Sequence, residues 1–208
     1  MELGIAPWNA PVILGTRALA MPLACGNTVV LKSSEICPAL LDLGGEAPLV
    51  VLDDADLDAA VDAATFGAFF NQGQICMPTE RIIVDAGIAD DFVPRLARRA
   101  ALLQRGDPRR DNALPGTLVG ADAGRRLQAL VDDAVLKGAV MSATVLDKVS
   151  PAMRLYHEES FGPLVTIVRV SGDDEALRIA NDSPFGLSSA VFSRAWTTIR
   201  TGPRHYPI

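Results

Sequence analysis

The feature that most constrains the fold of this chain is a regular alternation of short apolar runs with stretches of helical periodicity. Apolar, β-branched runs predict buried strands, and apolar residues that recur every three to four positions predict helices. Strands are expected at residues 28–31, 48–52, 82–84, 164–170 and 190–192. Helices are expected from Leu57 to a stop at Gly73, across residues 92–103, across residues 127–138, and around Leu177. Fully apolar strands that alternate with helices favour an α/β protein with a covered, largely parallel sheet.

Two stretches do not fit this alternation. Residues 32–47 leave little room for the helical crossover that two parallel strands of one sheet require, which takes at least about 10–12 residues. From residue 195 to residue 208 the apolar residues follow neither the strand nor the helix period. We therefore expect an abnormal connection before the strand at 48–52 and a tail without pattern.

The composition sets limits on function. With 49% apolar and 21% charged residues, the 208-residue chain is too apolar for intrinsic disorder. Its formal net charge of −6 has the wrong sign for general nucleic-acid binding. A local group of arginines is expected to form a solvated helix face and the loop after it: Arg95, Arg98, Arg99, Arg105, Arg109 and Arg110.

The cysteines and the apolar stretches of the chain indicate in which cellular compartment it is expected. The 3 cysteines, Cys25, Cys37 and Cys76, are odd in number and far apart, which is typical of a reducing cytoplasm and free thiols. The apolar stretch between residues 10 and 25 is interrupted by Gly15, Arg17 and Pro22, whereas a membrane span needs about 20 cleaner residues. We expect a soluble, cytoplasmic protein without a bound metal.

The segment that most directly indicates chemistry is Asn71-Gln72-Gly73-Gln74-Ile75-Cys76. A cysteine just after a glycine turn, at a junction between elements, is placed to be partly exposed, as reactive cysteines are. The alternative is an ordinary buried thiol, which is the commoner state of a free cysteine.

Three further segments could support such a thiol. Asn9 lies between Pro7 and Pro11, so its amide could be a rigid oxyanion donor, or it could be a turn residue in a Trp-Pro corner. Asp42 stands beside Gly44 and Gly45, which would let a ligand approach the backbone, although an isolated aspartate more often caps a helix. Residues 158–163 place two carboxylates and Phe161 before a turn, which could equally be a solvated turn with a core phenylalanine.

Taken together, these segments resemble the aldehyde dehydrogenase superfamily. Its characteristic motifs occur in the family's order at residues 7–11, 26–35, 41–45, 71–76, 159–163 and 181–187. The residues around Cys76 and Phe161 are most similar to those of the branch that acts on aromatic aldehydes such as salicylaldehyde and vanillin. The resemblance implies a partial Rossmann-like, dinucleotide-binding portion at residues 1–56. It further implies an α/β catalytic-thiol domain at 57–194, with a segment that returns to contact the cofactor, and leaves 195–208 as a tail outside the family pattern.

The resemblance also implies a reaction and a site. Cys76 matches the nucleophile of an NAD-dependent oxidation of an aldehyde to its carboxylate, which proceeds through a thiohemiacetal and a thioester. Asn9 and the backbone N–H of Cys76 match the oxyanion donors, and Asp42 stands where the family has a glutamate general base. The cofactor-contacting positions are Trp8, Lys32, Glu35, Gly44, Glu159 and Phe161. An acid at Glu35 favours NAD over NADP, and the implied partners are a small aldehyde and further copies of the chain.

The chain departs from the family pattern in what it lacks. The family has a long stretch with the pyrophosphate-contacting turn where this chain has only residues 36–40, and it has further regions before Pro7 and after Arg194. The chain therefore resembles a truncated, internally deleted aldehyde dehydrogenase. Three functions stay open: an oxidising enzyme, a catalytically impaired or non-catalytic remnant, and a cofactor-independent thiol esterase. Binding of NAD would separate the first from the others.

Overall fold

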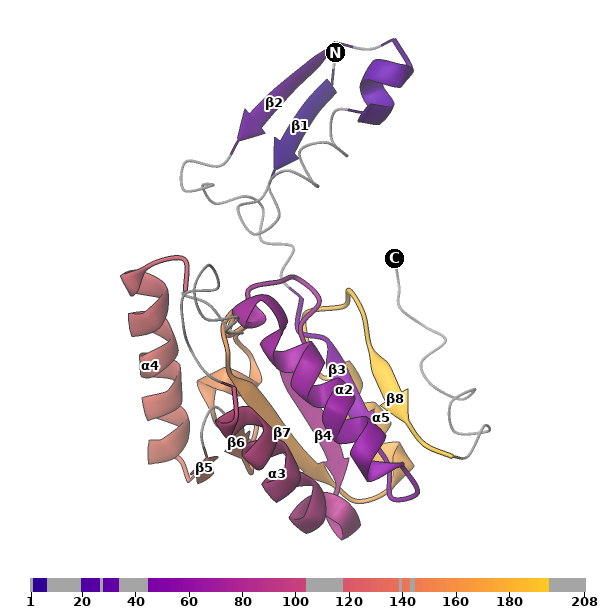
Figure 1. Ribbon diagram of the computed structural model, residues 1–208, viewed down its shortest axis with the longest axis vertical. Coiled ribbons are helices and arrows are strands. Elements are labelled where there is room, and N and C mark those ends of the chain that lie inside the picture. Colours follow the sequence, from indigo (N-terminus) through magenta and orange to yellow (C-terminus); the bar gives the residue numbers. More distant parts are fainter. Residues whose placement is uncertain are drawn as a thin grey trace. The chain divides into compact units, whose positions relative to one another are not determined.

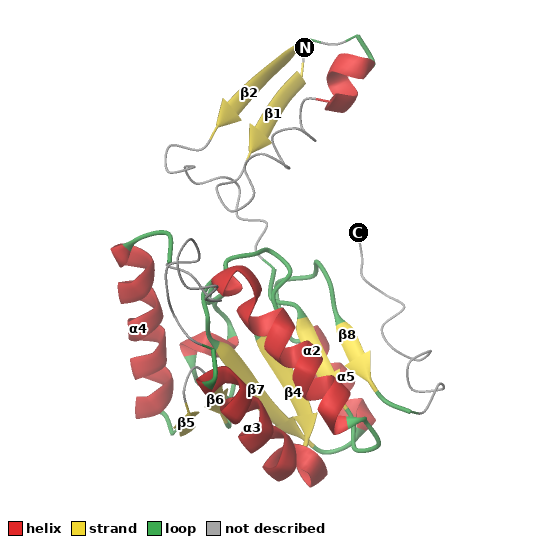
Figure 2. Ribbon diagram, viewed as in Figure 1, coloured by secondary structure: helices red, strands yellow, loops and turns green. Residues whose placement is uncertain are grey.

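The computed structural model of the protein describes residues 2–6, 20–26, 28–33, 45–103, 118–138, 140–142 and 145–194 (Figures 1 and 2). The chain divides into two compact units, Met1–Leu43 and Gly44–Ile208. Each unit has its own sheet.

The smaller unit holds a two-stranded parallel sheet. Strand β1 (Glu2–Ala6) pairs with β2 (Val29–Ser33), and residues 20–24 between them are helical. Strand β2 confirms the expected strand near residues 28–31, although β1 was not expected. The expectation that the strands near 28 and 48 belong to one sheet is wrong, because β2 pairs with β1 and the later strand lies in the other unit's sheet. Residues 32–47 therefore need no crossover helix.

The larger unit is built on a six-stranded sheet of order β5-β6-β7-β4-β3-β8. Its strands are β3 (Pro48–Val51), β4 (Arg81–Asp85), β5 (Val140–Ser142), β6 (Val145–Asp147), β7 (Val165–Val170) and β8 (Ala190–Phe192). All neighbouring pairs are parallel except β5 with β6, which confirms a largely parallel sheet. Because β3 pairs with both β4 and β8, this unit begins near Gly44, whereas we expected a boundary at residue 56.

Four helices of the larger unit follow the expected apolar spacing. They are α2 (Leu57–Phe69), α3 (Ala86–Ala101), α4 (Ala121–Leu136) and α5 (Asp173–Asn181). The side chain of Asp56 caps α2 by accepting the N–H groups of Asp58 and Ala59, both at 3.1 Å. Helix α2 ends at Phe69, before the expected stop at Gly73, and the short 3-10 helix η1 (Phe70–Gly73) continues the chain. A second 3-10 helix, η2 (Arg154–Tyr156), precedes β7.

Apolar side chains cover both faces of this sheet. In β3, Leu49 and Val51 join the core formed with α2 and α3, while Val50 joins the core formed with α4 and α5. Helices α2 and α3 lie side by side on one face (Figure 1). Because successive side chains of a strand point to opposite faces, a fully apolar strand needs such cover on both. The arrangement explains why the strands read as unbroken apolar runs.

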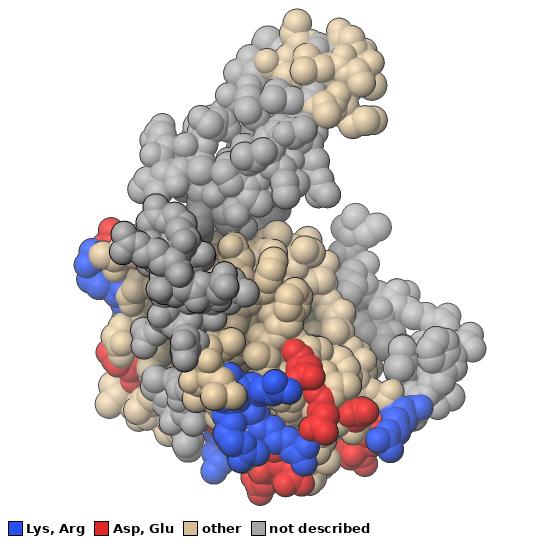
Figure 3. Space-filling model, in the orientation of Figure 1, with Lys and Arg blue, Asp and Glu red and all other residues tan. Residues whose placement is uncertain are grey.

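The arginines at the end of α3 lie on a solvated, ion-paired surface. Arg95 pairs with Asp58 at 2.8 Å and Arg99 pairs with Asp62 at 2.7 Å. Figure 3 shows basic and acidic groups interspersed on this face. This confirms a solvated helix face for that part of the cluster, while Arg105, Arg109 and Arg110 lie outside the described residues. Within the described ranges, every helix is too short or too polar to cross a bilayer.

Candidate thiol site

One edge of the six-stranded sheet gathers the segments that carry the motifs. Residues 45–47 lead into β3, residues 74–80 into β4, residues 159–164 into β7, and residues 183–189 into β8. Since these four strands are parallel, the segments that enter them meet at the same edge. Motifs that lie more than 100 residues apart in the sequence thereby become neighbours.

The loop before Cys76 reverses the chain after α2. Three successive residues adopt the left-handed conformation: Asn71 with φ 50°, Gln72 with φ 60° and Gly73 with φ 68°. Asparagine and glycine tolerate this region best, whereas glutamine rarely adopts it. The Asn71 side chain closes the loop by donating to the carbonyl of Gln74 at 3.0 Å, and the Gln74 N–H donates back to the Asn71 carbonyl at 3.0 Å. Cys76 emerges half-exposed, as we expected for a thiol at this junction.

Two glycines let neighbouring segments press directly on this loop. A Cβ atom on Gly45 would lie 1.7 Å from the carbonyl oxygen of Cys76. A Cβ atom on Gly73 would lie 2.1 Å from the carbonyl oxygen of Gly162. Both distances exclude any side chain, because real Cβ atoms do not approach backbone oxygen so closely. The thiol loop is therefore packed backbone-to-backbone against the β3 entrance on one side and the β7 entrance on the other.

Glu159 joins the same neighbourhood. Its Oε1 atom accepts the N–H of Gly45 at 2.9 Å. Phe161, two residues later, is half-buried and has a left-handed φ of 48°. The structure thus brings Cys76, Glu159 and Phe161 to one edge of the sheet.

The other proposed site residues cannot be placed at this edge. Lys32 has its backbone in β2 of the smaller unit. The remaining five lie outside the described residues: Trp8, Asn9, Glu35, Asp42 and Gly44.

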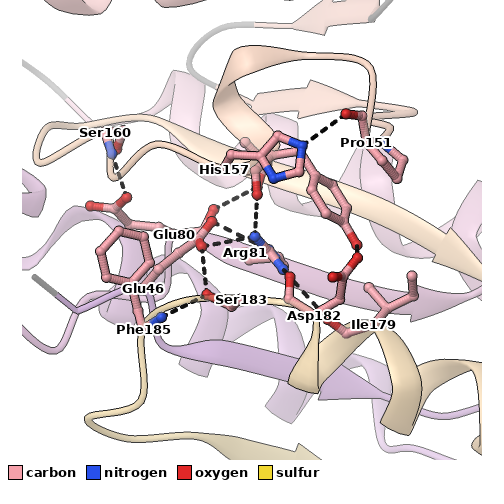
Figure 4. A network of polar contacts seen from close by, with 12 residues as sticks. Glu46, Glu80, Arg81, Pro151, His157, Ser160, Ile179, Asp182, Ser183 and Phe185 are labelled. Carbon is pink, nitrogen blue, oxygen red and sulfur yellow. Dashed lines mark hydrogen bonds and ion pairs between the residues drawn. The ribbon is translucent and has the colours of Figure 1, made fainter.

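A buried ion pair ties the β3 and β4 entrances together (Figure 4). The guanidinium of Arg81 donates to both carboxylate oxygens of Glu46, at 2.8 and 3.2 Å, and both side chains are 1% exposed. Arg81 also donates to the carbonyls of Tyr156, Asp182 and Ile179, and its guanidinium carbon lies 4.4 Å from the centre of the Tyr156 ring. One side chain therefore links β3, β4, η2 and the end of α5.

Glu80, the residue before Arg81, binds a different segment. Its Oε2 accepts the N–H of Ser160 at 2.6 Å, and its Oε1 accepts the N–H of Phe161 at 2.9 Å. Burial raises the pKa of Glu80 to about 8, even though the two N–H donors oppose the shift. Burial likewise raises the pKa of Glu46 to about 7 against the attraction of Arg81. The charge of Glu159 raises both pKa values further, so the three carboxyl groups are electrostatically coupled.

Sequence reasoning missed Glu46, Glu80 and Arg81. The available signal was Glu80-Arg81 directly before the apolar run Ile82-Ile83-Val84, since charges at the entrance of a buried strand require partners. Two further buried atoms, Gln74 Nε2 and Ser160 Oγ, have no hydrogen-bond partner in the described part of the chain. Those same ranges contain no group of three or more side chains that could hold a metal ion.

Fold and site together define an α/β protein with an accessible, backbone-supported thiol at the amino edge of a parallel sheet. The family model described as "Aldehyde dehydrogenase family" matches residues 2–41 and 35–202. The chain belongs to the aldehyde dehydrogenase family.

The chain is similar in sequence and structure to aromatic-aldehyde dehydrogenases. Vanillin dehydrogenase from Pseudomonas sp. strain HR199 is 47% identical over 92% of this chain and 56% of its own length. Salicylaldehyde dehydrogenase from Pseudomonas putida is 39% identical over the same shares. The crystal structure of a salicylaldehyde dehydrogenase from Pseudomonas putida G7, complexed with salicylaldehyde, matches with a TM-score of 0.88 and 38% identity, covering 96% of this chain and 58% of that one.

The matches differ from the chain in length. The chain spans about half the length of the curated relatives it matches. The alignment with the vanillin dehydrogenase extends over 271 positions, more than the 208 residues of the chain, so the relative contains residues with no counterpart here. The two stretches that fit the family model meet at residues 35–41. The same interval contains residues 36–40, where the sequence resemblance predicts a missing stretch.

Proposed function

We propose that Cys76 is the nucleophile of an aromatic-aldehyde dehydrogenase site and that its thiol chemistry survives in this chain. The observation that carries the proposal is the half-exposed thiol on a loop held between Gly45 and the turn that bears Glu159 and Phe161. The aromatic substrate class is supported by the vanillin and salicylaldehyde dehydrogenases among the relatives.

The proposed reaction uses the thiolate of Cys76. Its Sγ atom adds to the aldehyde carbon, a C–S bond forms, and the carbonyl electron pair moves to oxygen. The oxyanion accepts hydrogen bonds from the Cys76 N–H and, in our proposal, from the Asn9 amide. When the carbonyl re-forms, the carbon loses a hydride and becomes a thioester. Water then displaces the thiolate and the carboxylate leaves. In our proposal the proton of this water goes to Asp42, which occupies the sequence position of the family's glutamate base.

The hydride acceptor in this proposal is a nicotinamide dinucleotide, which supplies an oxidising ring when bound. The described residues fit its nicotinamide-ribose end. Glu159 presents a carboxylate suited to ribose hydroxyls, and Gln74 holds a buried amide donor that has no partner in the described ranges. The choice of NAD over NADP rests on Glu35, while a 34% identical relative from Deinococcus radiodurans is named as an NADP(+)-dependent succinate-semialdehyde dehydrogenase.

A second candidate function is an impaired remnant that keeps the thiol but oxidises poorly. The overlap of the two family matches at residues 35–41 favours it. The sequence resemblance implies that the family's pyrophosphate-contacting turn belongs to a long stretch for which this chain has only residues 36–40. Hydride transfer requires both reactants to be held in place, and the loss of one anchor removes much of the advantage of proximity. A cofactor-independent thiol esterase is the remaining alternative.

The test is NADH formation by the purified chain with salicylaldehyde and NAD. We expect turnover at least ~10²-fold below that of a full-length vanillin dehydrogenase, because the dinucleotide is poorly anchored. Cys76→Ser should abolish what remains, while the matched change Cys25→Ser on the exposed thiol should not alter it. Turnover near the full-length rate, with micromolar NAD affinity by calorimetry, would rule out the impaired state. Unchanged turnover in Cys76→Ser would rule out Cys76 as the nucleophile.

A further inference from the structure

The turn at residues 159–161 is held from two sides by charged side chains. Glu80, at the entrance of β4, accepts the N–H groups of Ser160 and Phe161 at 2.6 and 2.9 Å. Arg126, on α4, donates to the carbonyls of Glu159 and Ser160 at 2.9 and 2.5 Å. Four hydrogen bonds thus fix three consecutive residues, and the two that Arg126 donates come from a charged group, which makes them roughly twice as strong as neutral ones.

The turn needs such external support. Phe161 has a φ of 48°, in the left-handed region that a bulky residue rarely adopts. Glu80 is only 3% exposed, and burying a carboxylate is costly unless its oxygens are hydrogen-bonded. Its two oxygens accept the N–H groups of Ser160 and Phe161, and Figure 4 shows the bond with Ser160. A buried carboxylate aimed at two successive N–H groups therefore fixes a conformation that the sequence of the turn alone does not favour.

The turn in turn touches the thiol loop. Gly73 of that loop packs on the carbonyl of Gly162, which directly follows the turn. Glu159 reaches the N–H of Gly45, whose Cα packs on the Cys76 carbonyl. The location of the turn consequently sets where Glu159 and Phe161 stand relative to Cys76.

We propose that Glu80 and Arg126 are positioning residues that clamp the 159–161 turn and thereby fix Glu159 and Phe161 beside Cys76. The roles of those two side chains toward a cofactor rest on the proposed function above, whereas the clamp itself does not. Neither Glu80 nor Arg126 touches the reacting atoms in this proposal. They act through the backbone that they hold.

The test compares Glu80→Gln and Arg126→Ala with matched controls in the full chain. A glutamine amide can accept only one of the two N–H groups, and alanine donates to neither carbonyl. The control for Glu80 is Glu175→Gln, because the side chain of Glu175 also accepts a backbone N–H, that of Ser171. The control for Arg126 is Arg125→Ala, because Arg125 lies on the same helix and its side chain is 71% exposed. Residue-level hydrogen–deuterium exchange should quicken at least tenfold at one or both of the Ser160 and Phe161 amides in Glu80→Gln, with no change there in the controls.

A second readout separates positioning from general loosening. We expect the ratio of Cys76 to Cys25 alkylation to rise at least threefold in both clamp variants, measured where circular dichroism shows them folded. Unchanged exchange at both amides in Glu80→Gln overturns the proposal, as does equally quickened exchange throughout β4 and β7. Local quickening with an unchanged alkylation ratio also overturns it. Failure of the proposed function gives a different result. In that case Cys76 does not react in the wild-type chain, although the Ser160 and Phe161 amides there are protected from exchange.

Discussion

Replacing Arg81 with methionine is expected to lower the free energy of unfolding by about 3–5 kcal/mol. The change leaves the Glu46 carboxylate, 1% exposed, without its only buried cationic partner among the described residues, and it removes the donor shared by three backbone carbonyls. Burial already raises the pKa of Glu46 to about 7, so without Arg81 this carboxyl either stays charged without a counter-ion or takes up a proton, and both outcomes destabilise the fold. Urea denaturation followed by circular dichroism measures the loss.

Two variants make the Arg81 result interpretable. Arg178→Met breaks the exposed pair with Glu175, whose side chains are 63% and 41% exposed, and should cost less than about 1 kcal/mol. The double variant Arg81→Met with Glu46→Met removes both charges and should recover part of the loss, because an apolar pair of similar volume leaves no buried charge unpaired. A cost for Arg81→Met no larger than that of Arg178→Met would show that the buried pair does not hold the sheet edge together.

Replacing Gly45 with alanine should strongly disturb the thiol loop. The added Cβ would stand 1.7 Å from the Cys76 carbonyl oxygen, which is backbone and cannot swing aside. Overpacking of this kind costs about 1–3 kcal/mol. A shift of the order of 1 Å at a reacting group can cost about 10²-fold in rate, so we expect acylation of Cys76 to slow by at least tenfold.

Gly124→Ala is the control for this substitution. Gly124 lies inside α4, where the nearest atom to an added Cβ is 3.9 Å away on Leu118. Alanine should stabilise the helix there by about 0.5–1 kcal/mol and leave Cys76 unchanged. Thermal unfolding and Cys76 acylation measured on both variants check the pair. Equal effects of the two substitutions would mean that Gly45 does not support the thiol.

Much of the larger unit could be predicted because its strands are buried on both faces. The run Ile82-Ile83-Val84 lies in β4 with every one of these side chains inaccessible. Strand β8 also has the bounds we expected, although it is an edge strand in which Val191 is 38% exposed. Because helices cover both faces of a strand such as β4, its residues do not alternate between apolar and polar, and the unbroken apolar run predicts the strand. The short strands β5 and β6 were missed, because three residues are too few to establish a period.

The order of the sheet could not be predicted from local pattern. The alternation of runs predicts one sheet that contains the strands near residues 28 and 48, yet the strand near residue 28 pairs with β1. Pairing depends on contacts between distant residues, which periodicity does not encode. The same holds for the boundary between the two compact units.

The site could be predicted where the local sequence of a motif determines its backbone conformation. The Asn71–Cys76 segment contains the glycine and the asparagine that a left-handed loop requires, and its thiol is half-exposed as expected. The supporting charges were not predictable in this way. Glu80, Arg81 and Arg126 act on backbone groups 33 to 101 residues away, and no local spacing announces such contacts.

The central claim is that Cys76 is a nucleophile held ready by its surroundings, and the location of an aromatic acyl group tests it most directly. The purified chain would be treated with 4-nitrophenyl benzoate without cofactor, digested, and analysed by peptide mass spectrometry. Simple accessibility favours Cys25, which is exposed, over Cys76, which is only half-exposed. We predict that the benzoyl group is found on Cys76 and that Cys76→Ser abolishes the burst of 4-nitrophenolate. Benzoylation of Cys25 to an equal or greater extent would contradict the account.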